Sequence, residues 1–429
     1  LLYICQLQLT NINFYNHLSF MIDKLFAARP FIPRPVYTER IKPFINREII
    51  KVISGQRRVG KSYILFQIIE EITKSDQTAN IIYINKEVKP YEHIINDTIL
   101  YDYVKNELNP DTKNYLFVDE IQEIKHFEKA LRSLLAENCC DIFCSGSNAN
   151  MLSGELATYL AGRYIEFNIH SLGYDEFLSF FKLENSTQSL NKYLTVGGMP
   201  YLNVIGLDEF SVFEYLRNVY ASILLKDVVA REGIRNIAFL ENLIEFLADN
   251  TGNLFSASNI SKYMKSQLAS VSTQAVLNYL KPLTNAFFIH KVTRYDIAGL
   301  KIFESGEKYY FEDIGIRNCI RGFDRMKDIN KVMENAVYMH LIRSGFKVYV
   351  GQTGKSEIDF VAQKDGKTIY VQVAYLLADE NTINREFGNL AKISDNYRKY
   401  VVTMDEYNAG SNYFGIEQLH LKDFLLNMY

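Results

Sequence analysis

The chain has 429 residues, a length that indicates about three domains, and its 47 Lys and Arg against 50 Asp and Glu give a formal net charge of −3. With 48% hydrophobic and 23% charged residues, the composition excludes a disordered or fibrous chain. The near-neutral balance excludes a protein that is basic throughout and coats nucleic acid, although a local basic face remains open.

The first part of the chain alternates short apolar runs with helical patterns from about Glu48 onward. The apolar runs predict strands at 49–54, 81–84, 115–118, 141–144 and 164–167, and helices are expected at 61–73, 91–107 and 125–137. Strands joined by helices of this length form a parallel sheet, because each crossover returns the chain to the same edge. The sequence therefore predicts an α/β unit here.

The pattern changes after about residue 170. Residues 171–250 are mostly helical with a break at Gly197–Pro200, and 252–312 predict short helices followed by paired strands around Ile289 and Tyr309. From Met333 onward the pattern predicts a helix, strands at 346–350, 357–362 and 368–374, a helix near 383–394, a strand at 399–403 and a final short helix.

The cysteines and the lengths of the apolar runs indicate in which cellular compartment we expect the protein. Three of the five cysteines, Cys139, Cys140 and Cys144, crowd too tightly and on one side for a zinc site, and free thiols suit a reducing cytosol. No run of 18 apolar residues is free of charge or strong polarity, so we expect a cytoplasmic protein without a membrane span or signal peptide. Because the first methionine is Met21, we expect the preceding residues to lie upstream of the native start.

The strongest local motif matches G-x-x-x-x-G-K-[ST] between an expected strand and an expected helix. Its residues are Gly55, Gln56, Arg57, Arg58, Val59, Gly60, Lys61 and Ser62. The glycines let consecutive backbone N–H groups turn toward phosphate oxygens at a helix N-terminus. Lys61 is expected to reach the β- and γ-phosphates, and the Ser62 hydroxyl is expected to bind Mg²⁺. The motif therefore predicts a nucleotide-binding loop.

A second strand of the expected sheet, 115–118, ends in two acidic residues, Asp119 and Glu120. The carboxyl ends of parallel strands form the ligand edge of a sheet, so we expect Asp119 to reach the Mg²⁺ shell. Glu120 is then placed to polarise a water molecule for attack on the γ-phosphate.

Two further positions complete the expected site. Asn148, or its neighbour Ser147, follows the next strand and could hydrogen-bond the γ-phosphate or the attacking water, with a plain turn as the alternative. Arg163 precedes the strand at 164–167 and could act on a neighbouring subunit's nucleotide as an arginine finger, with a surface salt bridge as the alternative.

Together, the segments Gly55–Ser62, Phe117–Glu120, Ser145–Asn148 and Ala161–Tyr164 resemble the AAA+ superfamily. More narrowly, the chain from about residue 30 is similar to a prokaryotic set of AAA-type ATPases that share a C-terminal region of unknown function. The segments 225–229 and 385–388 also resemble parts of that family. The resemblance implies ATP rather than GTP and makes a homo-oligomer the expected partner, in a ring or a transient assembly.

With this resemblance, the chain divides into five parts. We expect an N-terminal extension (1–30), an AAA+ P-loop ATPase domain (31–170), a helical lid or linker (171–237), a winged-helix-like domain (238–324) and a nuclease-like domain (325–429). In the winged-helix layout, polar side chains on the helix expected at 271–280 could read DNA base edges. Few Lys or Arg accompany them, so a role in packing is an equal alternative.

Residues 325–429 look like the restriction-endonuclease-type PD-(D/E)XK fold, with Glu334 on a helix, Asp359 on a strand and Gln372 on the next strand. That chemistry needs clustered carboxylates for Mg²⁺ and a Lys two positions after the last of them, where this chain has Ala374. Nothing in the sequence positions Lys399 as a substitute. Because the missing cation would stabilise charge in the transition state, we expect an inactive scaffold.

Three functions therefore follow from the sequence. The first is an Mg²⁺-dependent ATPase whose cycle moves its C-terminal modules. The second is a nucleotide-gated switch that turns over slowly and exposes a DNA- or protein-binding surface. The third is an Mg²⁺-dependent nuclease. Phosphate release and its loss in Glu120→Gln would distinguish the first from the second, and plasmid cleavage that is lost in Asp359→Ala would be required for the third.

Overall fold

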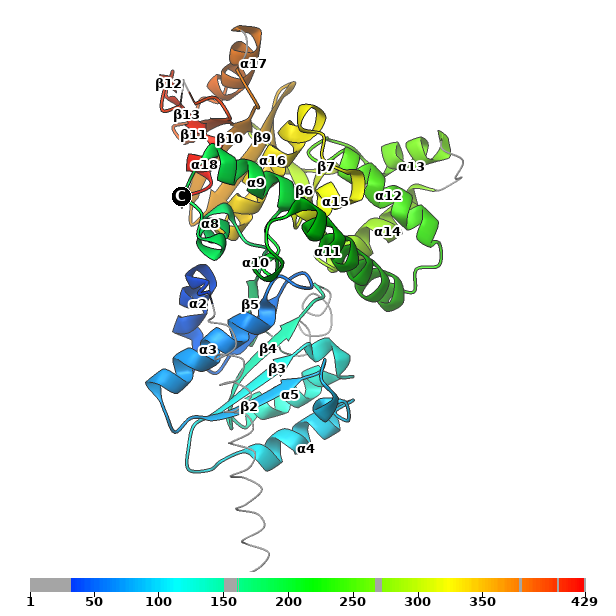
Figure 1. The fold of residues 1–429 in the computed structure, drawn as a ribbon, viewed down its shortest axis with the longest axis vertical. Helices are drawn as coiled ribbons and strands as arrows, with labels where there is room; N and C mark the ends of the chain where they lie inside the picture. Colours follow the sequence, from blue (N-terminus) through cyan, green and yellow to red (C-terminus); the bar gives the residue numbers. More distant parts are fainter. Residues whose placement is uncertain are drawn as a thin grey trace, which may run out of the picture.

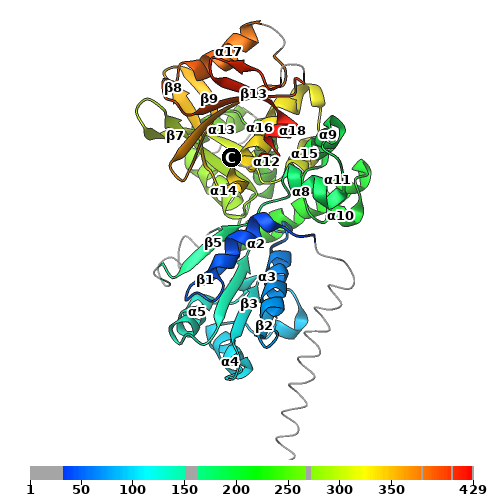
Figure 2. The same ribbon diagram turned by 90° about the vertical axis from the view of Figure 1, so that its left-hand side faces the viewer.

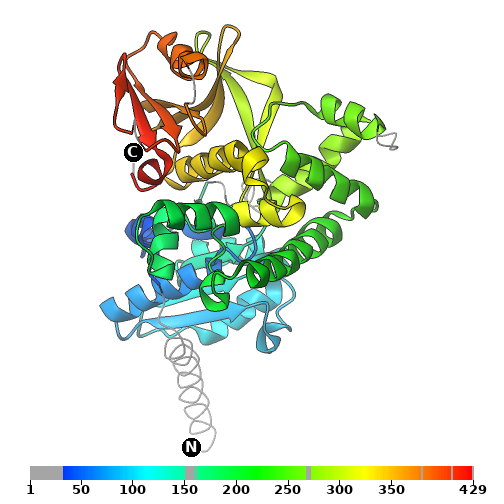
Figure 3. The same ribbon diagram turned by 45° about the horizontal axis from the view of Figure 1, so that its top comes forward.

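A computed structural model of the chain describes residues 32–149, 160, 162–266, 272–377, 380–406 and 409–427. Two β-sheets organise these residues (Figure 1, Figure 2). In Figure 3 the green helices of the middle segment lie between the blue-to-cyan sheet and the yellow-to-red sheet. The molecule thus has an N-terminal α/β unit, a helical middle and a C-terminal unit built on a second sheet.

The first sheet has five parallel strands in the order β2-β3-β4-β1-β5, which confirms the predicted parallel α/β unit. The strands are β1 (Ile50–Ser54), β2 (Asn80–Asn85), β3 (Asn114–Asp119), β4 (Asp141–Gly146) and β5 (Tyr164–Asn168). Because β1 and β3 both lie next to β4, the carboxyl ends of these three strands meet at one edge of the sheet.

Helices cover both faces of this sheet. α2 (Pro35–Ile41) and α3 (Lys61–Ser75) pack on one face, and α4 (Asp97–Glu107) and α5 (Phe127–Ala136) pack on the other. Alternate strand residues point into the two apolar clusters, as the period of a β-strand requires. Short 3₁₀ turns occur at η1 (Lys42–Phe44), η2 (Lys89–Tyr91) and η3 (Ile121–Glu123).

The helix predicted at 91–107 begins only at Asp97. Asn96 caps it, because the Asn96 side chain accepts the backbone N–H of Ile99 at 3.0 Å. The residues before the cap form the separate turn η2 and a short extended stretch. The prediction was therefore wrong for the first turn and a half of that helix.

The middle of the chain is helical, as the sequence predicts. It contains α8 (Tyr174–Phe181), α9 (Thr187–Val196), α10 (Leu202–Ile205), α11 (Glu209–Ser222), the π-helical segment η4 (Ile223–Ala230) and α12 (Ile237–Asp249). The described helices include none whose length and apolar character would let it cross a membrane.

The second sheet has eight strands in the order β12-β13-β11-β10-β9-β8-β6-β7. The strands are β6 (Ile289–Asp296), β7 (Lys301–Phe311), β8 (Lys347–Thr353), β9 (Ser356–Lys364), β10 (Lys367–Val373), β11 (Arg398–Thr403), β12 (Asn412–Tyr413) and β13 (Ile416–His420). The helices around it are α13 (Ala257–Ser266), α14 (Thr273–Asn285), α15 (Ile314–Arg321), α16 (Arg325–Arg343), α17 (Glu380–Ala391) and α18 (Leu421–Phe424).

This sheet runs across the boundary that the sequence places between residues 324 and 325. β6 pairs with β8 in parallel, with Arg294 opposite Val350, so the paired strands of the winged-helix-like part belong to the same sheet as the nuclease-like part. α16 begins at Arg325, eight residues before the predicted Met333, because Asp324 caps it by accepting the N–H of Met326. β12 and β13 were not predicted.

Candidate functional site

The loop between β1 and α3 has the backbone that its glycines require. Gly55 has φ 144°, and a Cβ there would lie 2.2 Å from the carbonyl oxygen of Ile169, so no other residue fits without movement. Gly60 has φ 97° and precedes the first turn of α3. The loop and the first turn of α3 therefore lie at the carboxyl edge of the sheet, the place where backbone N–H groups at a helix N-terminus can bind an anion.

Lys61 lies over this loop. Its ammonium donates to the carbonyl oxygens of Gly55 and Gln56, each at 3.1 Å, and lies 3.7 Å from the Glu120 carboxylate. Burial works against ionisation of Glu120, but the Lys61 charge, together with the Arg57 charge and hydrogen bonds from Gln122 and Ser147, outweighs it and lowers the pKa of that carboxyl. Lys61 and Glu120, nearly 60 positions apart, are thus neighbours in one charged site.

Asp119 ends β3 beside the same loop. It accepts hydrogen bonds from the hydroxyls of Ser62, Ser145 and, at 3.1 Å, Tyr83. Burial is the main cause that raises the pKa of Asp119. A hydroxyl and a carboxylate oxygen in hydrogen-bond contact are the hard oxygen ligands that Mg²⁺ prefers. Ser62 and Asp119 therefore fit a magnesium ion.

Asn148 and Arg163 have different positions. Asn148 follows β4 and lines a polar cavity with Glu120, so it lies near the charged site. Arg163 is exposed at the start of β5, where its carbonyl oxygen accepts the N–H of Ile50 at 3.0 Å. Since Ile50 begins the strand that ends at the loop, Arg163 lies at the opposite edge of the sheet. The structure does not bring it to the nucleotide loop of its own chain.

An arginine-carboxylate clamp completes the site, and the sequence analysis missed it. Arg57 donates two hydrogen bonds to Asp227 in η4, at 2.9 and 3.2 Å. Arg231, one turn later, pairs with Asp227 at 3.2 Å and donates to the carbonyl oxygen of Ser147 at 3.3 Å. The available signal was Asp227 inside the apolar segment 223–230, with Arg231 four positions later, just beyond its end.

A second cavity adjoins the loop. Its lining includes Lys61, Ser62 and three other loop residues (Arg57, Arg58 and Gly60), and also the apolar side chains of Ile32, Phe180, Pro200, Tyr201 and Val204. A cavity lined by both cationic and apolar side chains suits a nucleotide, whose phosphates are anionic and whose base is flat and largely apolar.

Arg34 ties the loop to the helical middle. Its buried guanidinium donates to the carbonyl oxygens of Val59 (2.8 Å) and His170 (2.9 Å), and also to the Glu176 carboxylate on α8 (2.8 Å). Arg343 on α16 lies 3.3 Å from the same Glu176 carboxylate. A buried chain of charges thus runs from the loop to the second sheet's longest helix.

The second sheet carries its own acidic cluster, with a lysine that the sequence analysis did not consider. Lys308, on β7, lies 2.8 Å from Glu334, 2.8 Å from Glu357 and 3.2 Å from Asp359. Gln372 accepts the backbone N–H of Asp359 at 3.2 Å. Lys399 instead donates to the carbonyl oxygen of Asp395. The cation among these acidic residues is therefore Lys308 on β7, which belongs to the winged-helix-like part, whereas Glu334 and Asp359 lie on α16 and β9 of the nuclease-like part.

Comparisons with known proteins identify the domain that carries the glycine loop. Residues 47–178 match the model of an AAA domain, and residues 187–327 match a domain of unknown function (DUF8612). A Haemophilus influenzae protein described as "Uncharacterized protein" is 35% identical over 405 residues, which cover 93% of this chain and 100% of that protein. The "Uncharacterized protein MJ1544" of Methanocaldococcus jannaschii is 32% identical over 386 residues, which cover 85% of each.

Among solved structures, the Walker-type ATPase PABY2304 of Pyrococcus abyssi is similar, with 14% identity and a TM-score of 0.44. The similarity covers 66% of this chain and 94% of that one.

Proposed function

The chain belongs to the family of these H. influenzae and M. jannaschii proteins and carries an ATP-binding P-loop ATPase domain of the AAA+ type, and on this premise we propose that it hydrolyses ATP with Mg²⁺ to move its C-terminal unit. One observation carries the proposal. Lys61 and Ser62 from the glycine loop meet Glu120 and Asp119 from the end of β3 at a single edge of the sheet.

We assign the chemical roles as follows. Lys61 and the amides of residues 55–62 hold the β- and γ-phosphates, and Ser62 and Asp119 hold Mg²⁺, which would neutralise phosphate charge when bound. Glu120 orients and polarises the attacking water, for which its ionised carboxylate is suited. Asn148 contacts the γ-phosphate from the end of β4, and the adenine lies in the apolar part of the cavity at Ile32 and Tyr201.

Two connections support a transfer of motion. The clamp Arg57–Asp227 joins the phosphate loop to η4, and the chain Arg34–Glu176–Arg343 joins it to α16. Both depend on the position of the loop backbone, which phosphate binding fixes. Arg163, exposed at the far edge of the sheet, would act on the nucleotide of a second copy in a homo-oligomer.

For the C-terminal unit we propose an inactive PD-(D/E)XK-like scaffold joined to a winged-helix-like part. Lys308 lies where its ammonium neutralises Glu334 and Asp359, and Gln372 is engaged with the backbone of Asp359. Exposed polar residues on α14, among them Gln274, leave DNA as the candidate partner of the winged-helix-like part.

The test is phosphate release with ATP and with GTP, each with and without DNA. Lys61→Ala should lose nucleotide binding, whereas Lys74→Ala, on the exposed side of the same helix, should behave as wild type. Glu120→Gln should bind ATP while its turnover falls by about 10² to 10⁴, the range for loss of a general base, and exposed Glu137→Gln is its control. ATP binding without turnover in the wild-type protein would favour the switch instead. DNA cleavage lost in Asp359→Ala would refute the inactive scaffold.

A further inference from the structure

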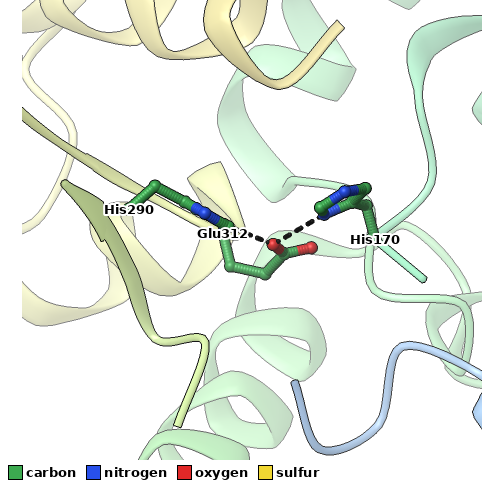
Figure 4. A group of neighbouring side chains, drawn as sticks. All are labelled: His170, His290 and Glu312. Carbon is green, nitrogen blue, oxygen red and sulfur yellow. Dashed lines mark hydrogen bonds and ion pairs between the residues drawn. The ribbon is translucent and has the colours of Figure 1, made fainter. Parts of the chain in front are cut away.

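Two histidines and a glutamate converge where the N-terminal unit meets the second sheet. Figure 4 shows His170, His290 and Glu312 pointing toward one another from three separate segments. His170 follows β5, His290 is on β6, and Glu312 directly follows β7. Their nearest ligand atoms all lie within 4.8 Å of one another. One carboxylate oxygen, Oε2 of Glu312, faces both rings, at 3.1 Å from His170 Nδ1 and 2.7 Å from His290 Nε2.

The Glu312 carboxylate is buried between the two imidazoles. Glu312 is 1% exposed, and its ion pairs among the residues that the structure describes are with the two imidazoles alone. An ionised carboxylate out of water needs a cation or a full set of hydrogen bonds. A metal ion held by neutral imidazoles would satisfy this requirement directly.

The surroundings hold the three side chains in place. Glu312 Oε1 accepts the N–H of Ser171 at 2.7 Å, and the Ser171 hydroxyl donates to the Glu312 carbonyl oxygen at 2.8 Å. The N–H of His170 donates to the Tyr37 hydroxyl at 3.1 Å, and the carbonyl oxygen of His170 accepts from Arg34. These bonds occupy the second carboxylate oxygen and the backbone, and they leave Oε2 as the atom that faces the rings. Outer contacts of this kind orient metal ligands in proteins.

We propose that His170 Nδ1, His290 Nε2 and Glu312 Oε2 bind a divalent transition-metal ion of the Zn²⁺ class, with water as a fourth ligand. Two imidazoles and one carboxylate are a ligand set typical of zinc with one open position, and they lack the all-oxygen character that Mg²⁺ or Ca²⁺ prefers. Ligands about 2.1 Å from a tetrahedral ion are about 3.4 Å apart, so the pair now at 2.7 Å needs to separate by less than about 1 Å.

The site would join the nucleotide domain to the second sheet. Ile169, the residue before His170, donates to the Ser54 carbonyl oxygen at 2.8 Å, and its own carbonyl oxygen lies against Gly55 of the phosphate loop. A metal ion bound to His170 would therefore hold the backbone beside that loop to β6 and to the residue that follows β7. The proposal concerns a site separate from the expected magnesium position at Ser62 and Asp119, and it does not depend on ATP hydrolysis.

The experiment uses the full chain, freed of nucleotide and treated with a chelator. Zn²⁺ is titrated in competition with a chromophoric chelator, and Co²⁺ is added separately, since a four-coordinate Co²⁺ site gives a strong visible absorption band. We expect one tight Zn²⁺ per chain, a rise in the melting temperature with Zn²⁺, and the Co²⁺ band. His290→Gln and Glu312→Gln should each weaken Zn²⁺ binding by at least about 100-fold, because even outer-contact changes cost 10- to 100-fold.

The control is His93→Gln, which removes an exposed histidine on α4's side of the first sheet and should bind Zn²⁺ as the wild type does. Thermal melting of each variant without metal shows whether it folds, and Glu312→Gln keeps an oxygen for the Ser171 N–H. Substoichiometric binding by the wild-type protein, or equal Zn²⁺ affinity in wild type and both folded variants, would overturn the proposal. The three residues would then form a hydrogen-bonded link only.

Discussion

Replacement of Lys308 by Met removes the one cation inside the acidic cluster of the second sheet. The Lys308 side chain is 2% exposed, and burial works against its charge, but Glu334, Asp359 and Glu357 outweigh this and raise its pKa well above the usual value. Loss of one partner from a buried ion pair costs about 3–5 kcal/mol, because it leaves an uncompensated buried charge. We therefore expect Lys308→Met to lower the free energy of unfolding by about 3–5 kcal/mol. Glu357 adds little to this figure, since 44% of its side chain is exposed.

A second variant tests the physical reason. In Lys308→Met/Glu334→Gln the buried negative charge at residue 334 is absent, and the amide can still accept the hydrogen bond that Tyr310 donates at 2.6 Å. The double variant should therefore be more stable than the sum of the two single changes predicts, by about 0.5–3 kcal/mol.

The assay is urea unfolding followed by circular dichroism, with hydrogen exchange of β9 and α16 to locate the effect in the second sheet. Lys327→Met, which removes an exposed lysine paired with Asp324, is the matched control and should cost less than about 1 kcal/mol. A Lys308→Met protein within about 1 kcal/mol of wild type, or strict additivity in the double variant, would refute the view that Lys308 neutralises the cluster.

Two further predictions concern residues near the nucleotide and in α16. Arg231→Ala removes the contact with Ser147 and half of the clamp on Asp227, so ATP hydrolysis should fall by at least about tenfold while the protein still folds; equal single-turnover rates in variant and wild type would contradict this. Burial, with a smaller effect of Arg343, lowers the pKa of His340 to about 3, whereas an unfolded histidine takes up a proton below about pH 6.5. The unfolded state then binds more protons, so the free energy of unfolding of the wild type should fall by up to about 1.4 kcal/mol for each pH unit as the pH is lowered from about 6.5 to 3. The fall should be smaller for His340→Gln, and urea unfolding at a series of pH values measures both. Equal slopes for the two proteins would show that His340 does not stay neutral in the fold.

Local sequence was enough to predict the strands of the first sheet and the residues at the ends of those strands. Each strand is a short apolar run followed by a turn or a helix, and a buried parallel strand leaves few other ways to place such a run. The loop Gly55–Ser62 could be predicted from the sequence, because phosphate binding by such a loop depends on backbone angles and residue spacing within one continuous segment. Asp119 and Glu120 followed from the rule that carboxyl ends of parallel strands share an edge. Helix ends were less certain, because single caps such as Asn96 decide them.

Tertiary structure alone decided which distant side chains meet. Lys308 and Glu334 lie 26 positions apart, Arg57 and Asp227 lie 170 apart, and His170 and Glu312 lie 142 apart. No periodicity links such residues, since their contacts depend on how β6 joins β8 and how η4 packs beside the loop. The alternation along a strand determines toward which face of the sheet a side chain points. Which charged residue of another element lies opposite that side chain depends on how whole units pack together. For this protein the amino-acid sequence determined the nucleotide loop and its sheet. Packing between units determined that Lys308 lies in the acidic cluster and that His170, His290 and Glu312 meet.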